Sequence, residues 1–295
     1  MAEERAVLTG SSPSRPSAAA ATPPLEPLLV VDDLAKAFRT PEGSLAALER
    51  IAFAVREGEF VSIIGPSGCG KSTLFNIIGG LIDSFQGRVT IAGAPISGPH
   101  AAIGMVFQEE STFPWRTVVE NVAFPLEIQG MPKQKRLARA RHFIALVGLE
   151  GFEQRYPFEL SGGMRQRVAI ARTLAFEPKI LLMDEPFGAL DEQTRLLLGD
   201  KVLQIQQELK QTTLLITHSI AEAVQLSDRI VIMTYRPGRV KRIVDVGLPR
   251  PRTLDLVGSD AFGRYVAEIW HDLREETSRG MREAEARVRG MPHRL

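Results

Sequence analysis

The feature that most constrains this chain is a glycine-rich segment set between a buried-strand pattern and a helical pattern. Residues 65–73 read Gly-Pro-Ser-Gly-Cys-Gly-Lys-Ser-Thr and match the pattern G-x-x-x-x-G-K-[ST]. The apolar run at 60–64 predicts a strand before it, and residues 73–78 predict the first turns of a helix after it. This order of elements predicts a phosphate-binding loop, called the phosphate loop below.

The residue types in the phosphate loop suit a triphosphate. Its three glycines let the backbone curl so that successive N–H groups point at an anion, and the following helix N-terminus adds unpaired N–H groups. Lys71 is expected to reach the β- and γ-phosphates, and the Ser72 hydroxyl to bind Mg²⁺. A plain glycine-rich turn is the alternative for this motif alone. The predicted nucleotide contacts are Gly65, Pro66, Ser67, Gly68, Cys69, Gly70, Lys71, Ser72 and Thr73.

Composition excludes several protein classes. The chain has 295 residues, 44% of them hydrophobic, and a net charge of +1, so a soluble globular protein without a nucleic-acid partner is expected. No apolar run approaches the roughly 18 residues that cross a bilayer. The single cysteine, Cys69, excludes an intramolecular disulfide and favours a reducing compartment. Its backbone N–H is all that the phosphate loop requires of it.

The chain divides into three predicted parts. Residues 1–27 are rich in Ala, Ser, Pro and Thr and predict a disordered leader without a signal peptide. Strand and helix patterns then alternate, which predicts an α/β domain over 28–250 with a largely parallel sheet. Prolines and helical spacing over about 109–165 predict an inserted helical subdomain.

Residues 251–295 predict one amphipathic helix and a charged tail. The tail is expected to fray beyond Arg279. The helix residues predicted to share one apolar face are Phe262, Tyr265, Val266, Ile269, Trp270 and Leu273.

Two carboxylates follow the apolar run at 180–183. Such a strand buries itself and delivers Asp184 and Glu185 to its tip, where α/β sheets bind ligands. Asp184 is expected to hold Mg²⁺ through water, opposite Ser72, and Glu185 to act as the general base. Phosphoryl transfer depends mainly on positioning and charge stabilisation, which this arrangement supplies.

A second anion-binding pattern lies far from the phosphate loop. Residues 160–166, called the signature segment, place Ser161, Gly162 and Gly163 at a helix N-terminus. A simple helix cap explains Ser161 but not the glycines. Two phosphate-binding patterns in one chain suggest that two chains enclose each nucleotide.

Taken together, the motifs resemble the ATP-binding cassette (ABC) ATPase subunits over about residues 28–250. The resemblance rests on the order and spacing of the phosphate loop, Gln108, the signature segment, the acidic strand end, Leu190-Asp191 and His218. It implies a P-loop NTPase (RecA-like) core with an antiparallel β subdomain and the inserted helical subdomain. ATP and Mg²⁺ are the implied cofactors.

The resemblance implies a role for each further residue. Phe38 matches an aromatic that stacks on adenine, although a core phenylalanine remains the alternative. Gln108 matches a glutamine that touches Mg²⁺ and the attacking water and senses the membrane subunit. His218 matches a histidine on the γ-phosphate.

The remaining motif residues are implied to act across a dimer. Ser161 and Gly163 match residues that contact the γ-phosphate held by a second copy. Asp191 matches a loop that crosses the dimer interface.

A narrower resemblance concerns the importer branch for nitrate, sulfonate and taurine. It rests on residues 113–118, 185–191, 236–238 and 248–252 and on Met164. It implies a peripheral subunit at the cytoplasmic face of the inner membrane, paired with a second copy, bound to a permease and served by a substrate-binding protein. Relatives in this branch import bicarbonate, cyanate or pyrimidine precursors, so the solute stays open.

Three other classes of protein are alternatives to an importer subunit. A cassette of DNA repair or chromosome structure would carry a long coiled-coil insertion, and a translation cassette usually repeats the whole motif set. A non-hydrolysing module would lack Lys71 or Glu185, and both are present.

Overall fold

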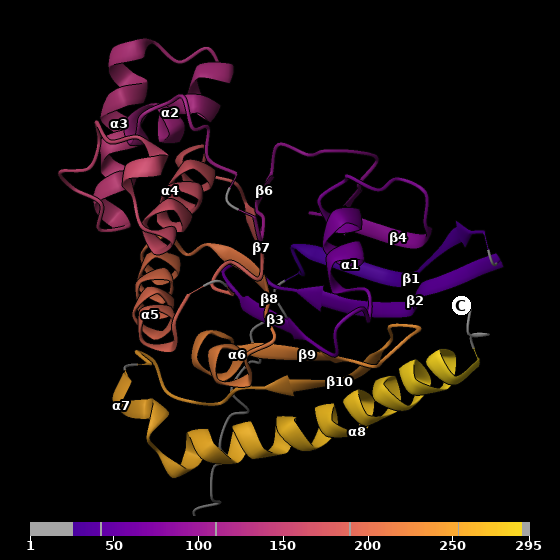
Figure 1. Ribbon diagram of the computed structural model, residues 1–295. Helices are drawn as coiled ribbons and strands as arrows, with labels where there is room; N and C mark the ends of the chain where they lie inside the picture. The colour runs from indigo at the N-terminus through magenta and orange to yellow at the C-terminus, as the bar shows by residue number, and fades with distance from the viewer. Residues whose placement is uncertain (1–25, 42, 110, 189, 253, 291–295) are drawn as a thin grey trace, which may run out of the picture.

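The computed structural model describes residues 26–41, 43–109, 111–188, 190–252 and 254–290, so most of the predicted leader lies outside the described residues. A six-stranded sheet forms the centre (Figure 1) and has the order β10-β9-β3-β8-β7-β6. Its strands are β3 (Phe60–Ile64), β6 (Ile103–Val106), β7 (Ile180–Asp184), β8 (Thr212–Ile216), β9 (Arg229–Met233) and β10 (Val240–Asp245).

The central sheet separates two cores because side chains alternate along each strand. In β7, Ile180 and Leu182 face the core under helix α1 (Lys71–Ile78), whereas Leu181 and Met183 face the helices on the other side. All ladder pairs from β9 to β6 are parallel, and β10 is antiparallel to β9. A parallel sheet buried on both faces accounts for the nearly continuous apolar strands.

A four-stranded antiparallel sheet, ordered β2-β1-β4-β5, packs beside α1. Its strands are β1 (Leu29–Thr40), β2 (Gly43–Val55), β4 (Gln86–Ile91) and β5 (Ala94–Pro95). β1 and β2 are longer than the short strands that the sequence predicts at 28–31 and 51–55. This antiparallel sheet and the parallel central sheet confirm the predicted α/β core with an antiparallel β subdomain.

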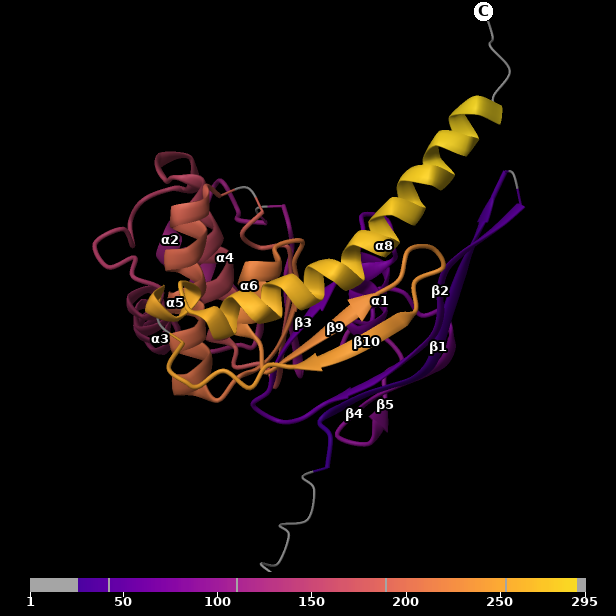
Figure 2. The same cartoon turned by 90° about the horizontal axis from the view of Figure 1, so that it is seen from below.

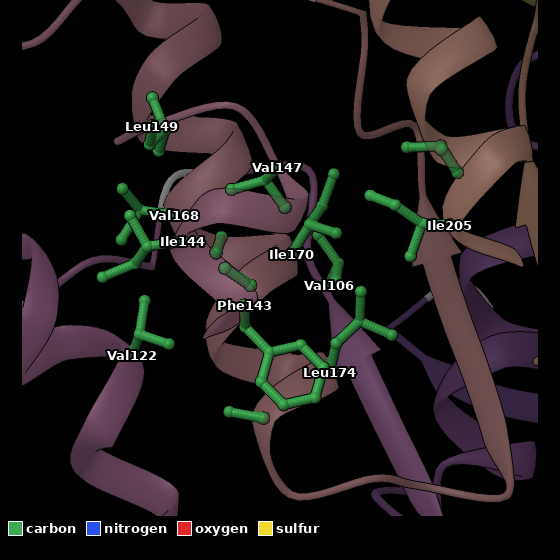
Figure 3. Packing of buried hydrophobic residues seen from close by; sticks show 14 of the residues in the cluster. Val106, Val122, Phe143, Ile144, Val147, Leu149, Val168, Ile170, Leu174 and Ile205 are labelled. Atoms are coloured by element: carbon green, nitrogen blue, oxygen red, sulfur yellow. The ribbon is translucent and has the colours of Figure 1, made fainter. Parts of the chain in front are cut away.

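The inserted helical subdomain lies to one side of the central sheet, beyond β6 and β7 (Figure 1). It contains α2 (Val118–Ile128), α3 (Lys133–Leu146), the 3₁₀ turn η1 (Pro157–Glu159) and the start of α4 (Gly162–Ala175). Apolar side chains from these helices interlock in Figure 3, where Phe143 of α3 lies near Leu174 of α4. The same core continues to Val106 of β6 and to α5 (Glu192–Leu209), so the subdomain is anchored to the sheet.

The C-terminal segment forms two helices where the sequence predicts one. α7 (Leu254–Val257) is followed by α8 (Asp260–Gly290), which runs along β9 and β10 and past α6 (Ile220–Leu226) (Figure 2). The helix continues beyond Arg279, where fraying was predicted. Phe262 and Ile269 are buried against the β9–β10 side of the sheet. The sequence predicts Trp270 on the same face, but its side chain is 60% exposed. Successive side chains along a helix point about 100° apart, so Trp270 points away from the surface that Ile269 contacts.

Across the described part of the chain, no helix is both long enough and apolar enough to span a membrane.

The docking of α8 generates a stability prediction. Ile269→Ala removes a side chain with no exposed surface and should lower the free energy of unfolding by about 2–4 kcal/mol. Trp270→Ala is the matched control, one residue away and largely exposed, and should change it by less than about 0.5 kcal/mol. Urea unfolding of the full chain measures both. Equal losses would contradict the placement of α8.

Candidate functional site

The phosphate loop connects β3 to α1 and is bent by two glycines. Gly68 and Gly70 have φ values of 74° and 101°, which side chains other than glycine rarely adopt. A Cβ at Gly70 would lie 2.9 Å from the Ala47 carbonyl oxygen, so the loop packs tightly on β2. Glycine is therefore required here by both conformation and space.

Lys71 is buried beneath the loop, with 7% of its surface exposed. Its Nζ donates to the carbonyl oxygens of Gly65 at 2.8 Å and Pro66 at 3.2 Å. Within the described residues no carboxylate forms a salt bridge with it. A buried ammonium whose hydrogen-bond acceptors are neutral groups is available to an anion in the pocket above it.

Glu185 lies at the meeting point of three strand ends. Its carboxylate Oε2 is 3.4 Å from Nδ1 of His218, which follows β8, and 3.5 Å from Nε2 of Gln108, which follows β6. Because β6, β7 and β8 are neighbouring parallel strands, their carboxyl ends share one edge. The predicted catalytic residues Glu185, His218 and Gln108 are thus brought together.

The backbone of Glu185 is left-handed, with φ of 46°. Its N–H still donates to the Ile216 carbonyl oxygen at 2.9 Å, so the turn occurs directly after the last ladder bond. A non-glycine residue in this conformation costs roughly 1 kcal/mol or more. The turn directs the Glu185 side chain toward His218.

A pocket of about 380 Å³ opens over the phosphate loop. Phe38 lines it and is 38% exposed, which excludes the alternative of a core phenylalanine. Lys36 lies over the Phe38 ring, with its Nζ 4.9 Å from the centroid. The lining residues are Phe38, Leu45, Ala47, Ser67, Gly68, Gly70, Lys71, Ser72, Thr73, Glu185 and Arg236.

The signature segment is not part of that pocket. Ser161 caps α4 by accepting from the Met164 N–H at 3.3 Å, and Asp191 caps α5 by accepting from the Thr194 N–H at 3.0 Å. A Cβ at Gly163 would lie 3.4 Å from Leu190, so the two helix starts are neighbours. Both caps form, but in a single chain they lie apart from the loop that would hold the nucleotide.

Comparison with known proteins identifies the family. The ABC transporter family model matches residues 48–188. An uncharacterized ABC transporter ATP-binding protein of Methanocaldococcus jannaschii is 49% identical over 254 residues, which cover 86% of this chain and 94% of that protein. The chain belongs to the ABC transporter ATP-binding proteins. It is therefore an ATPase subunit that binds ATP.

Other ABC relatives include importers. The nitrate import ATP-binding protein NrtD of Synechocystis sp. is 44% identical over 83% of this chain and 95% of that protein. The aliphatic sulfonates import ATP-binding protein SsuB of Bacillus cereus is 45% identical over 76% of this chain and 88% of that protein.

A solved ABC cassette has the same fold. The dimeric post-hydrolysis structure of the cassette MJ0796, bound to ADP and Pi, covers 75% of this chain and all of that chain, with a TM-score of 0.67 and 34% identity.

The residues predicted to bind Mg²⁺ fit that ion in this ABC subunit. Ser72 lies close enough to the Asp184 carboxylate to affect its pKa, which places two oxygen ligands together beside the loop. Burial raises the pKa of Asp184, and the interaction with Ser72 and the charge of Lys71 oppose part of that rise. Mg²⁺ uses one or two carboxylates together with substrate phosphates, so a cage of carboxylates is not required. In keeping with this, the described residues hold no cluster of three or more acidic, histidine or cysteine ligands.

Sequence reasoning missed Glu222, which shapes the turn that carries His218. The Thr217 hydroxyl donates to the Glu222 carboxylate, and Thr217 Oγ1 accepts from the Ser219 N–H at 3.0 Å. Glu222 is only 7% exposed. Burial raises its pKa to about 7, although the Thr217 hydrogen bond and the Arg195 charge oppose this and the Glu185 charge adds to it. No contiguous motif signals such a role.

The raised pKa of Glu222 predicts a pH-dependent stability. Its pKa is about 7 in the folded chain, above the 4.5 of an unperturbed glutamate, so the folded state binds more protons than the unfolded state between these values. The contribution of Glu222 is thus full below about pH 4.5 and is lost as the pH rises through about 7, by up to roughly 3 kcal/mol. Glu222→Gln should flatten this decline in the free energy of unfolding, measured with urea across that pH range. Glu275→Gln, at an exposed position of α8, should not flatten it. An unchanged decline in Glu222→Gln would contradict the assignment.

Proposed function

We propose that this ABC subunit drives a bacterial importer for a small anion or sulfonate, of the nitrate, sulfonate, taurine and bicarbonate class. The observation that carries the proposal is the likeness to both a nitrate and an aliphatic sulfonate import subunit over three quarters or more of the chain. The subunit would act as a peripheral protein on the cytoplasmic face of the inner membrane, beneath a separate permease. A substrate-binding protein outside the membrane would deliver the solute to the permease.

Two copies are proposed to enclose two ATP molecules. The separation of the signature segment from the pocket within one chain supports this arrangement, since a partner's Ser161, Gly162 and Gly163 would complete each site. The dimeric cassette bound to ADP and Pi, which is similar to this chain, also supports it. Asp191, beside Gly163, would then lie at the interface between the copies.

Hydrolysis is assigned to the residues around Glu185. The Glu185 carboxylate accepts a proton from a water as that water's oxygen bonds to the γ-phosphorus, and the bond from phosphorus to the bridging oxygen breaks, leaving ADP and phosphate. Lys71 and His218 stabilise the charge on the γ-phosphate, and Gln108 orients the water. Ser72 and Asp184 would hold Mg²⁺, with Gln108 nearby, and the bound ion would neutralise phosphate charge. Phe38 stacks on the adenine.

Glu185→Gln tests this assignment. The amide keeps the size of the side chain but cannot accept the proton, so hydrolysis should fall by at least about 100-fold while ATP still binds and holds the dimer together. ATPase assay and gel filtration with ATP measure the two effects. Hydrolysis at the normal rate would remove Glu185 as the base. Lys71→Ala is the companion variant and should weaken nucleotide binding itself.

The permease contact is proposed at a groove of about 480 Å³ on the helical subdomain. Asn121, which is fully buried, accepts from the Phe113 N–H at 2.8 Å and donates to the carbonyl oxygens of Phe113 and Arg116. These bonds fix the loop that presents Trp115, which is 72% exposed at the groove. Because this loop follows Gln108 along the chain, movement at the nucleotide site can reach the groove.

Trp115→Ala tests the permease contact. Loss of the indole should reduce co-purification with the permease while basal ATPase activity is kept, because Trp115 is not among the pocket residues. Trp270→Ala is a matched control, since it removes the other tryptophan of the chain, also exposed, from α8. Association that survives Trp115→Ala intact would place the contact elsewhere.

The solute is tested by uptake in a strain that lacks this protein. Labelled nitrate, taurine, an alkanesulfonate and bicarbonate are offered in parallel, with cyanate and a pyrimidine precursor as alternatives. Loss of one of the first four supports the proposal. Loss of an alternative alone, or of none, would contradict the proposed class while leaving the ATPase assignment intact.

A further inference from the structure

The turn between β9 and β10 lies directly on the phosphate loop. At its tip the Gly238 N–H donates to the Ala47 carbonyl oxygen at 2.9 Å, and its carbonyl oxygen accepts from the Glu49 N–H at 2.9 Å. A Cβ at Gly238 would lie 2.0 Å from the Cys69 carbonyl oxygen. The turn is thus wedged between β2 and the phosphate loop, and its position is fixed relative to both.

This turn places Arg236 at the nucleotide pocket. The Arg236 Nε donates to the Gly68 carbonyl oxygen at 2.7 Å, and a Cβ at Gly68 would lie 2.8 Å from the Arg236 Nη2. The guanidinium therefore lies against the phosphate loop and lines the same pocket as Lys71 and Ser72.

The terminal nitrogens of Arg236 are available to a ligand. Neither has a hydrogen-bond acceptor among the described residues, and within that part of the chain no carboxylate pairs with this arginine. Arg239 on the same turn differs, because it donates to the Glu49 carboxylate at 2.8 Å. Arginine presents its donors as a planar fork that matches two phosphate oxygens.

Helix α8 braces the turn from the other side. The Tyr235 N–H donates to Glu276 Oε2 at 3.0 Å, and Gly280 lies against the Tyr235 ring, where a Cβ would approach to 2.8 Å. Figure 2 shows α8 crossing beside β9 and β10 and passing their connecting turn. Lys241 of β10 adds salt bridges to Glu275 at 2.8 Å and Glu276 at 3.2 Å.

We propose that Arg236 binds phosphate oxygens of the nucleotide, as a second cation beside Lys71, and that α8 holds the turn in the position this requires. The proposal rests on the pocket over the phosphate loop being the nucleotide site. A triphosphate carries several negative charges, and Lys71 is the only cation that the loop motif itself supplies. The charges of Lys71 and Arg236 both act on the Cys69 thiol between them, although burial dominates there and raises its pKa.

Equilibrium binding of ADP, a non-hydrolysable ATP analogue and adenosine to the full chain tests the phosphate contact. Arg236→Gln keeps an amide donor for Gly68 but removes the charge. It should weaken the binding of ADP, of the ATP analogue or of both by about 10-fold, which is the usual loss for a charged hydrogen bond. The affinity for adenosine should stay unchanged. Arg239→Gln is the matched control from the same turn and should leave all three affinities unchanged.

Two results would overturn the phosphate contact. The first is an unchanged affinity of Arg236→Gln for both ADP and the ATP analogue. The second is an equal loss of affinity for all three ligands, adenosine included, because it would mean that Arg236 only supports the conformation of the phosphate loop. Lys71→Ala is measured in parallel. If it also leaves ADP binding unchanged, the proposed nucleotide site itself fails, whereas a loss in Lys71→Ala alone rejects only Arg236.

A double-mutant cycle tests the role of α8. Glu276→Ala should weaken ADP binding severalfold in the native background and have no further effect in the Arg236→Gln background. Glu275→Ala is the matched control, since Glu275 binds Lys241 but not Tyr235, and should leave ADP binding unchanged. Additive losses, or no loss in Glu276→Ala, would overturn the bracing role.

Discussion

The structure depends on a buried ammonium group that has only neutral partners. Lys71 lies beneath the phosphate loop and donates to the carbonyl oxygens of Gly65 and Pro66. Removing a charge from water is unfavourable, and an anion in the pocket offsets that cost. The glycines at 68 and 70 allow the backbone to close around this group. The fold therefore holds a positive charge in position for a phosphate before any ligand binds.

The parallel sheet then places the chemistry beside that charge. β3 ends in the phosphate loop, β7 ends at Asp184 and Glu185, and β8 and β6 are followed by His218 and Gln108. Because these strands are neighbours and run the same way, residues over a hundred positions apart meet at one edge. Glu185 has a strained backbone at this edge, which is where strain is commonly held for function.

Much of the site could be predicted because its residues lie in contiguous motifs at strand and helix ends. The loop, the acidic strand tip, and the caps at Ser161 and Asp191 each carry a local sequence signal. Glu222 lies in no such motif, and residues 236–238 support only the resemblance to the importer branch, without indicating a nucleotide contact. Arg236 reaches the pocket through the close packing of Gly238 on Cys69, and Glu222 reaches the His218 turn by tertiary burial, which no short pattern records.

The same distinction explains the errors in the fold. Trp270 carries the apolar character of a core residue, but one helical step from Ile269 turns it to solvent. The length of the β1–β2 pair is set by register against neighbouring strands rather than by its own composition. Local propensity gives the element types well, whereas lengths and faces follow from packing.

Mixed dimers distinguish a nucleotide site built from two copies of the chain, as proposed, from a site that one chain forms alone. Lys71→Ala and Ser161→Phe subunits should each be inactive when assayed alone, because one lacks the loop cation and the other blocks the signature segment. In a mixed dimer, one site combines both defects and the other pairs an intact loop with an intact signature segment. The account predicts that mixing restores a clear part of the ATPase activity. No recovery from a well-mixed population would indicate that each chain forms its site alone and would contradict the account.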